Sequence, residues 1–167
     1  EGIRKMMKVR GRPLTGAVPK PKIGFTAKEH AEVGYETWMG GFDFVKDDEN
    51  LTSVSFNRFD DRVKFMTKLR DKAEKETGEK KSAFLNITAD VDTMKKRADL
   101  LAANGWNYCM IDVVVAGTAG VMTMRDYCSD LGLAIHAHRA MHSTFTRNRK
   151  HGITMQFLAK IMRLVGV

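Results

Sequence analysis

Short apolar runs rich in β-branched and aromatic residues alternate along the chain with longer stretches whose apolar residues recur at helical spacing. The short runs are typical of buried strands, and the longer stretches predict amphipathic helices. The expected strands are residues 16–23, 41–46, 82–88, 107–115 and 132–138. The expected helices cover residues 27–39, 58–77, 91–103, 119–130 and 153–164. The pattern is therefore a βα unit repeated five times.

Local signals mark the ends of some of these helices. Thr26 and Glu29 have the spacing of a capping box, which predicts a helix start. Gly78 follows the amphipathic stretch 58–77, at the position where glycine commonly ends a helix.

Alternating βα units predict an α/β fold with a parallel sheet and helices packed outside it. Two architectures are compatible with this pattern. One is an open, doubly wound sheet, which five strands would suit, and the other is a closed barrel, whose common form needs eight strands. No glycine-rich phosphate-binding motif follows the first strand. Polar residues gather instead at the carboxyl ends of the first, second and fifth strands, and active sites of parallel α/β folds lie at that rim.

Composition is that of an ordinary globular domain, with 167 residues of which 43% are hydrophobic and 29% charged. No apolar run is long enough to predict a membrane span, and the basic N-terminus lacks the apolar region of a signal peptide. The chain starts at Glu1 rather than Met and stops just after a predicted helix. We therefore expect it to be a piece of a longer protein.

The net charge of +8 raises the question of nucleic-acid binding. The basic residues are scattered and no aromatic residues are interleaved with them, so a solvated surface or a pocket for a phosphorylated substrate explains them as well. We expect no nucleic-acid partner. Cys109 and Cys128 lie in apolar patterns without CxxC spacing, which indicates buried free thiols and a cytoplasmic protein.

Two lysines stand at the end of the first predicted strand. Lys20 and Lys22 are two residues apart, so an extended chain would place both on one face, with Pro21 on the other. On an inner face they would need an anion or lowered pKa values. An edge strand from which both reach water is the alternative, and Pro21 is compatible with it.

The second predicted strand ends in "FVKDDEN", in which Lys46 and Asp48 share a face, Glu49 sits at the turn and Asp47 points away. Two carboxylates suit Mg²⁺, which prefers oxygen ligands. A hydrated acidic turn is the alternative, and the ammonium of Lys46 would repel a cation.

The fifth predicted strand carries histidines in alternation. His136 and His138 share a face, and Arg139 and His142 follow in "HAHRAMH". An arginine beside a histidine at a strand end can bind phosphate and move protons. At the third and fourth strand ends, Asn86, Thr88 and Asp112 are each typical of buried, hydrogen-bonded strand residues.

Together these blocks resemble a known family. "KPKIG", "GGFDFVKDDEN" and "HAHRAMH", joined by "NRFDDR", "ETGEKK", "LNITAD" and "HGI", are similar to the large subunit of ribulose-1,5-bisphosphate carboxylase/oxygenase (RuBisCO) over essentially the whole chain. "VPKPKIG", "NRFDDR" and "TFTRN" are most similar to its archaeal type, form III. Val18 departs from the pattern, since many members have a substrate-contacting threonine there.

The resemblance implies a TIM (βα)8 barrel, of which residues 16–167 would supply the first five βα units. Residues 1–15 would form a short helix, about residues 2–9, and a linker. The N-terminal domain, which completes the site of the partner in a homodimer or higher homo-oligomer, would be absent. Also absent would be the sixth-strand loop with its CO2-orienting lysine and the later strands that hold one phosphate.

The resemblance also implies roles for site residues. Lys46 would be carbamylated by CO2, bind Mg²⁺ together with Asp48 and Glu49, and take the C3 proton of the substrate. Lys20 would handle protons at C2, and Lys22 would bind substrate.

In the histidine-rich block, the resemblance implies proton transfer during hydration for His138. Arg139 would bind a phosphate and His142 the substrate.

The implied reaction is carboxylation of D-ribulose 1,5-bisphosphate to two 3-phosphoglycerates through an Mg²⁺-stabilised enediolate, with oxygenation by O2 as a side reaction. The archaeal type is linked to nucleotide salvage. The 167-residue piece alone is expected to be inactive. One alternative is a RuBisCO-like enolase or isomerase, against which "HRAMH" counts. Another is a non-catalytic basic binding or assembly module.

Overall fold

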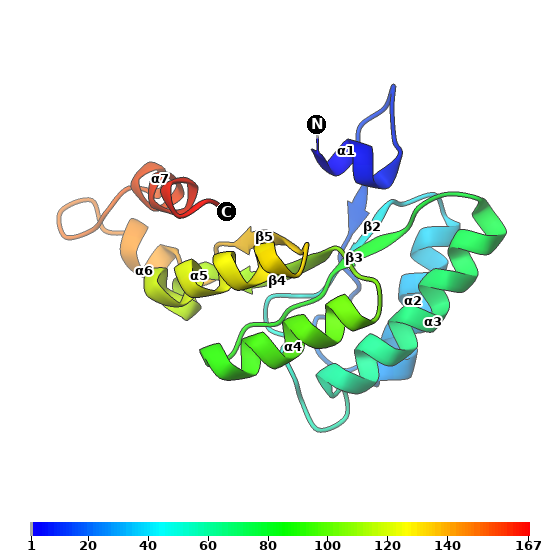
Figure 1. The fold of residues 1–167 in the computed structure, drawn as a ribbon. Helices are drawn as coiled ribbons and strands as arrows, with labels where there is room; N and C mark the ends of the chain where they lie inside the picture. Colours follow the sequence, from blue (N-terminus) through cyan, green and yellow to red (C-terminus); the bar gives the residue numbers. More distant parts are fainter. Residues whose placement is uncertain (1) are drawn as a thin grey trace.

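The computed structural model describes residues 2–167, which form five short parallel strands and seven helices (Figure 1). The strands are β1 (Gly16–Ala17), β2 (Phe44–Lys46), β3 (Ser82–Phe84), β4 (Tyr108–Asp112) and β5 (Ala134–His138). The helices are α1 (Gly2–Met7), α2 (Ala27–Met39), α3 (Phe59–Thr77), α4 (Val91–Ala103), α5 (Val113–Asp130), α6 (Ser143–Thr146) and α7 (Met155–Val165).

The strands lie side by side in the order in which they occur along the chain. β1, β2 and β3 pair in parallel, as do β4 and β5. A parallel bridge between Asn86 and Met110 joins the two groups, with hydrogen bonds from Met110 N to Leu85 O and from Ile87 N to Met110 O. The order of strands does not reverse, as it would in a doubly wound sheet. The predicted parallel α/β fold is confirmed.

Successive side chains of a strand point to opposite faces of the sheet, and here both faces are packed against other parts of the protein. Val45, Ala83 and Ile111 point into the main core, which they share with Trp38 of α2 and Met66 of α3 and with buried residues of α4 and α5. Helices α2 to α5 therefore cover one face of the strands, and Figure 1 shows α2, α3 and α4 gathered there.

The opposite face begins with an aromatic cluster. Phe44 stacks on Phe84 with ring centroids 4.6 Å apart, and Tyr108 meets both rings edge-on. Met7 of α1 packs against this cluster and covers it at the amino ends of the strands. Beyond the aromatic rings, toward the carboxyl ends, the same face becomes polar.

The helix ends follow the sequence signals. The Thr26 side chain accepts a hydrogen bond from Glu29 N, and the Glu29 carboxylate accepts one from Thr26 N, so the predicted capping box is confirmed. Gly78 adopts φ +70° and ends α3, a conformation that glycine takes without steric cost.

Several predicted boundaries are wrong: the third strand, predicted to reach residue 88, ends at Phe84, and two further errors affect the candidate site residues. The first strand ends at Ala17 instead of continuing to residue 23, so Lys20 and Lys22 do not alternate on a strand. The fourth strand ends at Asp112, where its partner β5 also ends, and the β-branched run that follows is helical. Gly117 (φ +73°, ψ 155°) interrupts α5 five residues after Asp112. Tertiary context thus overrides the local β propensity of this run.

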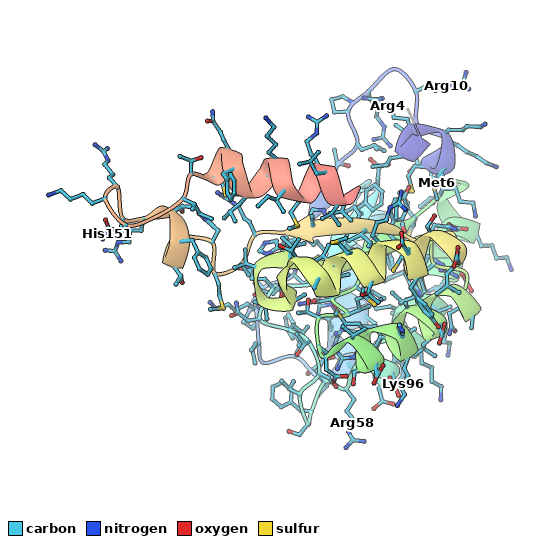
Figure 2. All side chains as sticks on the ribbon, turned by 60° about the vertical axis from the view of Figure 1, so that its left-hand side comes forward. Arg4, Met6, Arg10, Arg58, Lys96 and His151 are labelled. Carbon is cyan, nitrogen blue, oxygen red and sulfur yellow. The ribbon has the colours of Figure 1, made fainter. Side chains whose placement is uncertain are left out.

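The surface charge is dispersed. Figure 2 shows the labelled residues Arg4 and Arg10, Arg58 and Lys96, and His151 at three separate regions of the molecule. Both cysteine thiols are buried and unbridged, as predicted. Among residues 2–167, no helix combines the length and apolar character needed to cross a membrane.

Candidate functional site

The carboxyl ends of β2, β3, β4 and β5 bring polar side chains together on the inner face. Lys46 ends β2, Asn86 follows β3, Asp112 ends β4 and His138 ends β5. The register aligns Asp112 directly with His138, and Asn86 bridges to Met110 next to them. Each of these residues lies an even number of positions from the aromatic ring on its own strand, which places it on the same face.

Lys46 is held in a narrow, largely buried position, with only 16% of its side chain exposed. Its ammonium donates a hydrogen bond to the carbonyl oxygen of Asp47 (2.6 Å) and lies 3.6 Å from the sulfur of Met110. Its Nζ is also 3.7 Å from Oε2 of Glu49. The lysine therefore faces the acidic turn that follows it.

Asp48 pairs with Lys20, although Lys20 comes from a loop rather than from a strand. The Lys20 ammonium lies 2.5 Å from Oδ2 of Asp48, and Oδ1 accepts hydrogen bonds from the backbone and side chain of Asn50. Burial alone would raise the pKa of Asp48, but these hydrogen bonds outweigh it and lower that pKa to about 2. Asp48 is therefore an ionised carboxylate at neutral pH.

Glu49 lies between Lys46 of β2 and His138 of β5. Its Oε2 lies 3.7 Å from Lys46 Nζ and 3.7 Å from Nε2 of His138. The pKa of Lys20 is raised chiefly by its hydrogen bond to Asp48, and the charge of Glu49 contributes in the same direction. The Glu49 carbonyl accepts a hydrogen bond from the side chain of Asn86 (3.2 Å).

Asp47 lies on the other side of the strand end, as the alternation predicts. It is fully buried, accepts hydrogen bonds from Arg62 Nε (3.0 Å) and Asn86 N (2.9 Å), and lies 3.0 Å from His30. Burial opposes ionisation, but the Arg62 and His30 charges and the hydrogen bonds lower the pKa of Asp47. Asp47 therefore ties β2 to α2, α3 and β3.

His138 lies between two carboxylates. Its Nδ1 is 3.2 Å from Oδ1 of Asp112, and its Nε2 faces Glu49. Burial raises the pKa of Asp112 against the opposing effects of Asn86 and His138. Sequence reasoning treated Asp112 as a structural strand residue, and only the pairing of β4 with β5 places it beside the histidine.

His136 sits one step deeper on the same face. Its ring lies 4.7 Å from that of Phe84 and 6.4 Å from that of His138. Burial, followed by repulsion from Lys46 and His138, lowers the pKa of His136 to about 4. His136 is therefore a neutral imidazole at physiological pH.

Three predicted residues lie outside this cluster. Lys22 is exposed, and within residues 2–167 it makes no side-chain hydrogen bond or ion pair. His142 contacts Thr146 through Nδ1 (3.0 Å). Arg139 is exposed and, with His138, lines a cavity of about 620 Å³ between β5, α5 and α7. The cavity is otherwise mostly apolar, with Phe145 and Met162 among its lining residues.

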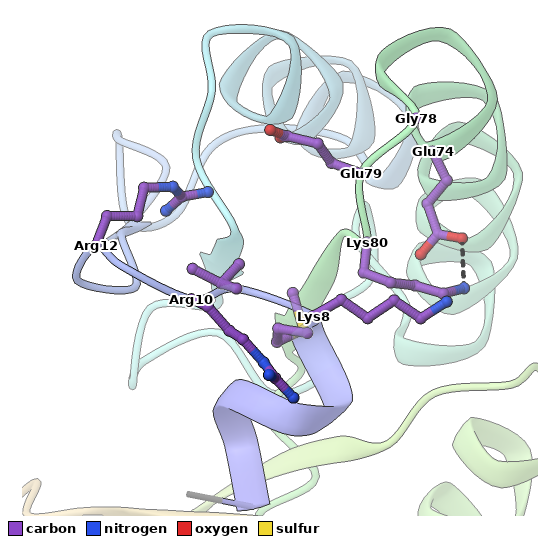
Figure 3. Close-up of a pocket in the computed structure, with 9 residues that line it drawn as sticks. Lys8, Arg10, Arg12, Glu74, Gly78, Glu79 and Lys80 are labelled. Atoms are coloured by element: carbon purple, nitrogen blue, oxygen red, sulfur yellow. Dashed lines mark hydrogen bonds and ion pairs between the residues drawn. The ribbon is translucent and has the colours of Figure 1, made fainter.

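A second cavity, of about 320 Å³, lies at α1 and the end of α3, beside the amino ends of the strands (Figure 3). Two of its basic residues pair with carboxylates, Lys80 with Glu74 (2.8 Å) and Arg12 with Asp43 (2.7 Å), and Lys8 and Arg10 also line it. None of the sequence-predicted site residues lines this cavity.

A divalent cation such as Mg²⁺ needs several oxygen ligands. Within residues 2–167, no three His, Cys, Asp or Glu side chains are placed to hold a metal ion. Asp48 and Glu49 offer carboxylate oxygens, and Lys46 lies beside them as an ammonium. Conversion of that ammonium to a carbamate anion would supply a third oxygen donor. The three residues would then offer oxygen donors, the kind of ligand that Mg²⁺ prefers.

Comparison with known proteins gives one consistent result. The family model for the ribulose bisphosphate carboxylase large chain, catalytic domain, matches residues 1–167. The chain is 57% identical over 167 residues to ribulose bisphosphate carboxylase from Pyrococcus abyssi, covering 100% of this chain and 39% of that protein. It is 52% identical to the enzyme of the same name from Methanocaldococcus jannaschii, with the same coverage.

Solved structures agree with this. Octameric RuBisCO from Pyrococcus horikoshii, crystallised with sulfate, superimposes with a TM-score of 0.96 at 56% identity, covering 99% of this chain and 39% of that one. Dimeric RuBisCO from Hyperthermus butylicus gives a TM-score of 0.97 at 46% identity, covering 100% and 39%. The chain thus spans about two fifths of the length of these relatives, and the predicted resemblance is confirmed.

Proposed function

The chain belongs to the family of ribulose bisphosphate carboxylase large chains, and we propose that the complete protein carboxylates D-ribulose 1,5-bisphosphate to two molecules of 3-phosphoglycerate. Oxygenation of the same substrate by O2 would be the side reaction. The observation that carries this proposal is the set of contacts that link Lys20, Lys46, Asp48, Glu49 and His138 beyond the carboxyl ends of the parallel strands.

Lys46 is proposed as the residue that CO2 activates. Its neutral amine attacks CO2, a C–N bond forms and one proton is released, which leaves a carbamate anion. Glu49 lies 3.7 Å from the Lys46 ammonium, and Mg²⁺ would offset two of the three negative charges that the carbamate, Asp48 and Glu49 would carry. When bound, Mg²⁺ supplies Lewis-acid polarisation of the oxygens of the sugar.

Protons would move through the residues that surround this centre. The carbamate of Lys46 is proposed to take the C3 proton, and Lys20 to carry protons at C2, including the final protonation after C–C cleavage. Lys20 stands within hydrogen-bond distance of Asp48 and is otherwise exposed, so it can approach a substrate bound there. His138 is proposed to transfer a proton during hydration.

The phosphates of the substrate require cations. Arg139 is exposed beside His138 and is proposed to bind one phosphate, since its guanidinium can make paired hydrogen bonds. Lys22 and His142 are proposed to contact substrate in the complete protein. Val18 offers no hydroxyl for such a contact.

The five strands, parallel and in sequence order, suit the first five βα units of a TIM (βα)8 barrel, with residues 1–15 as its lead-in segment. We propose that the complete chain closes this barrel, adds an N-terminal domain, and acts as a homodimer or higher homo-oligomer in the cytoplasm. Similar solved structures are octameric and dimeric.

Labelled CO2 tests the proposed activity. The complete chain, incubated with ribulose 1,5-bisphosphate, Mg²⁺ and labelled CO2, should give two 3-phosphoglycerates per substrate, with label in half of them. An isomerised sugar phosphate without label would instead establish a RuBisCO-like enolase or isomerase. The 167-residue chain alone should fix no CO2, because the proposed sixth-strand lysine and the partner's domain are missing from it.

A further inference from the structure

Asp112 is a buried carboxylate among the strand ends to which no role has been given. Only 2% of the residue is exposed. Its Oδ2 accepts a hydrogen bond from Asn86 Nδ2 (3.3 Å), and its backbone N–H donates to Thr88 Oγ1 (2.9 Å). Its Oδ1 has no hydrogen-bond donor among the described residues and lies 3.2 Å from His138 Nδ1.

A buried carboxyl oxygen without a hydrogen-bond partner is unfavourable, and native structures rarely retain one. The two atoms are within hydrogen-bond distance, so one proton between Asp112 and His138 satisfies both groups. The strand register brings them opposite each other, and Ala140 N–H approaches the same ring nitrogen at 3.1 Å. The two contacts alternate: Nδ1 accepts from Ala140 N–H when it is unprotonated and can donate to Asp112 when it carries a proton, and in both states Nε2 is the nitrogen that faces Glu49.

We propose that Asp112 is a positioning residue for the carboxylation reaction, which holds Nδ1 of His138 and thereby directs Nε2 toward the space beside Glu49. This inference rests on the proposed function, in which His138 transfers a proton. Asn86 strengthens the arrangement, because its single side-chain amide bonds both the Asp112 carboxylate and the backbone carbonyl of Glu49.

A direct metal-binding role for Asp112 fits less well. Its Oδ2 is engaged by Asn86 and its Oδ1 faces His138, so neither oxygen is directed at Asp48 or Glu49. The geometry is that of a carboxylate orienting a histidine, an arrangement in which the outer carboxylate fixes the ring and leaves the other nitrogen free to react.

The test uses the complete chain with Asp112→Leu and Asp112→Asn. Leucine removes the hydrogen bond from Asn86 and the contact with His138 Nδ1, so kcat should fall roughly 10- to 100-fold while KM changes little. Asparagine keeps the size and the hydrogen bond from Asn86, but its amide N–H would donate to Nδ1 and hold the opposite tautomer of His138, so kcat should stay low although the fold is intact. Asp92→Leu, at an exposed position on α4, is the matched control and should keep wild-type kcat. Equal kcat for wild type and Asp112→Leu would overturn the proposal.

A double-mutant cycle separates positioning from general structural damage. If Asp112 acts through His138, adding Asp112→Leu to His138→Ala should cause no further loss of kcat. A further loss as large as in the wild-type background would contradict the proposal. Crystal structures give a readout independent of activity: the imidazole should turn away from Glu49 in Asp112→Leu. An unmoved ring refutes positioning, whereas a wild-type protein that fixes no CO2 refutes the proposed function instead.

Discussion

Replacing Arg62 by methionine should destabilise the fold far more than a typical surface substitution. The Arg62 side chain is completely buried and paired with buried Asp47 at 3.0 Å. Its guanidinium also donates to the backbone and side chain of Asn57 (3.2 and 2.9 Å) and to Thr52 O (2.7 Å). Methionine fills similar space but leaves the Asp47 carboxylate buried without its strongest counter-charge.

Removing one partner of a buried ion pair costs about 3–5 kcal/mol, chiefly because the remaining charge stays uncompensated. Each carbonyl acceptor that loses its hydrogen bond from Arg62 adds to that cost unless water reaches it. We therefore expect the free energy of unfolding to fall by about 3–5 kcal/mol. Because Asp47 precedes Asp48 and Glu49, the same change should also weaken Mg²⁺ binding in the complete protein.

Guanidinium denaturation followed by tryptophan fluorescence measures this effect, since both tryptophans, Trp38 and Trp106, are buried in the main core. Arg125→Met is the matched control. Arg125 pairs with Asp126 at an exposed site, so its loss should cost less than about 1 kcal/mol. The double variant with Asp47→Leu should recover much of the loss, because both charges are gone.

A loss for Arg62→Met no larger than that for Arg125→Met would refute the reasoning. It would mean that Asp47 becomes protonated or hydrated at little cost, and that the network does not hold the strand end.

Two further predictions concern acid stability and a backbone position. The lowered pKa of Asp48, about 2 in the folded protein, gives stability that is complete above pH ~4 and lost as the pH falls toward 2. Acid denaturation should show this loss in the wild type and a smaller one in Asp48→Asn. Gly117→Ala should destabilise the protein by about 1–3 kcal/mol, because φ +73° with ψ 155° is accessible essentially only to glycine. Gly120→Ala, in the helical part of α5 with an ordinary 3.7 Å contact, should be neutral or stabilising, and thermal denaturation of both variants measures the difference.

The alternation of strand residues was the most informative signal in the sequence. It correctly separates Lys46, on the inner face, from Asp47, which lies in the structural network with Arg62. It also places His136 and His138 on one face. These inferences succeed because they depend only on the geometry of a single strand.

The remaining features depend on contacts between distant segments. Lys20 reaches Asp48 from a loop, so the strand argument gave it a wrong local structure although it lies at the site. Asp112 gains its significance only from the register between β4 and β5. The strand end at Asp112 was missed because the valines that follow favour extended structure locally.

The chemical state of Lys46 is the central claim, and ¹³C NMR with labelled CO2 tests it most directly. In the presence of Mg²⁺, the complete wild-type protein should show one carbamate carbon resonance that is absent from Lys46→Arg, together with activation that depends on CO2. A wild-type protein without this resonance, or a Lys46→Arg variant with full activity, would contradict the account.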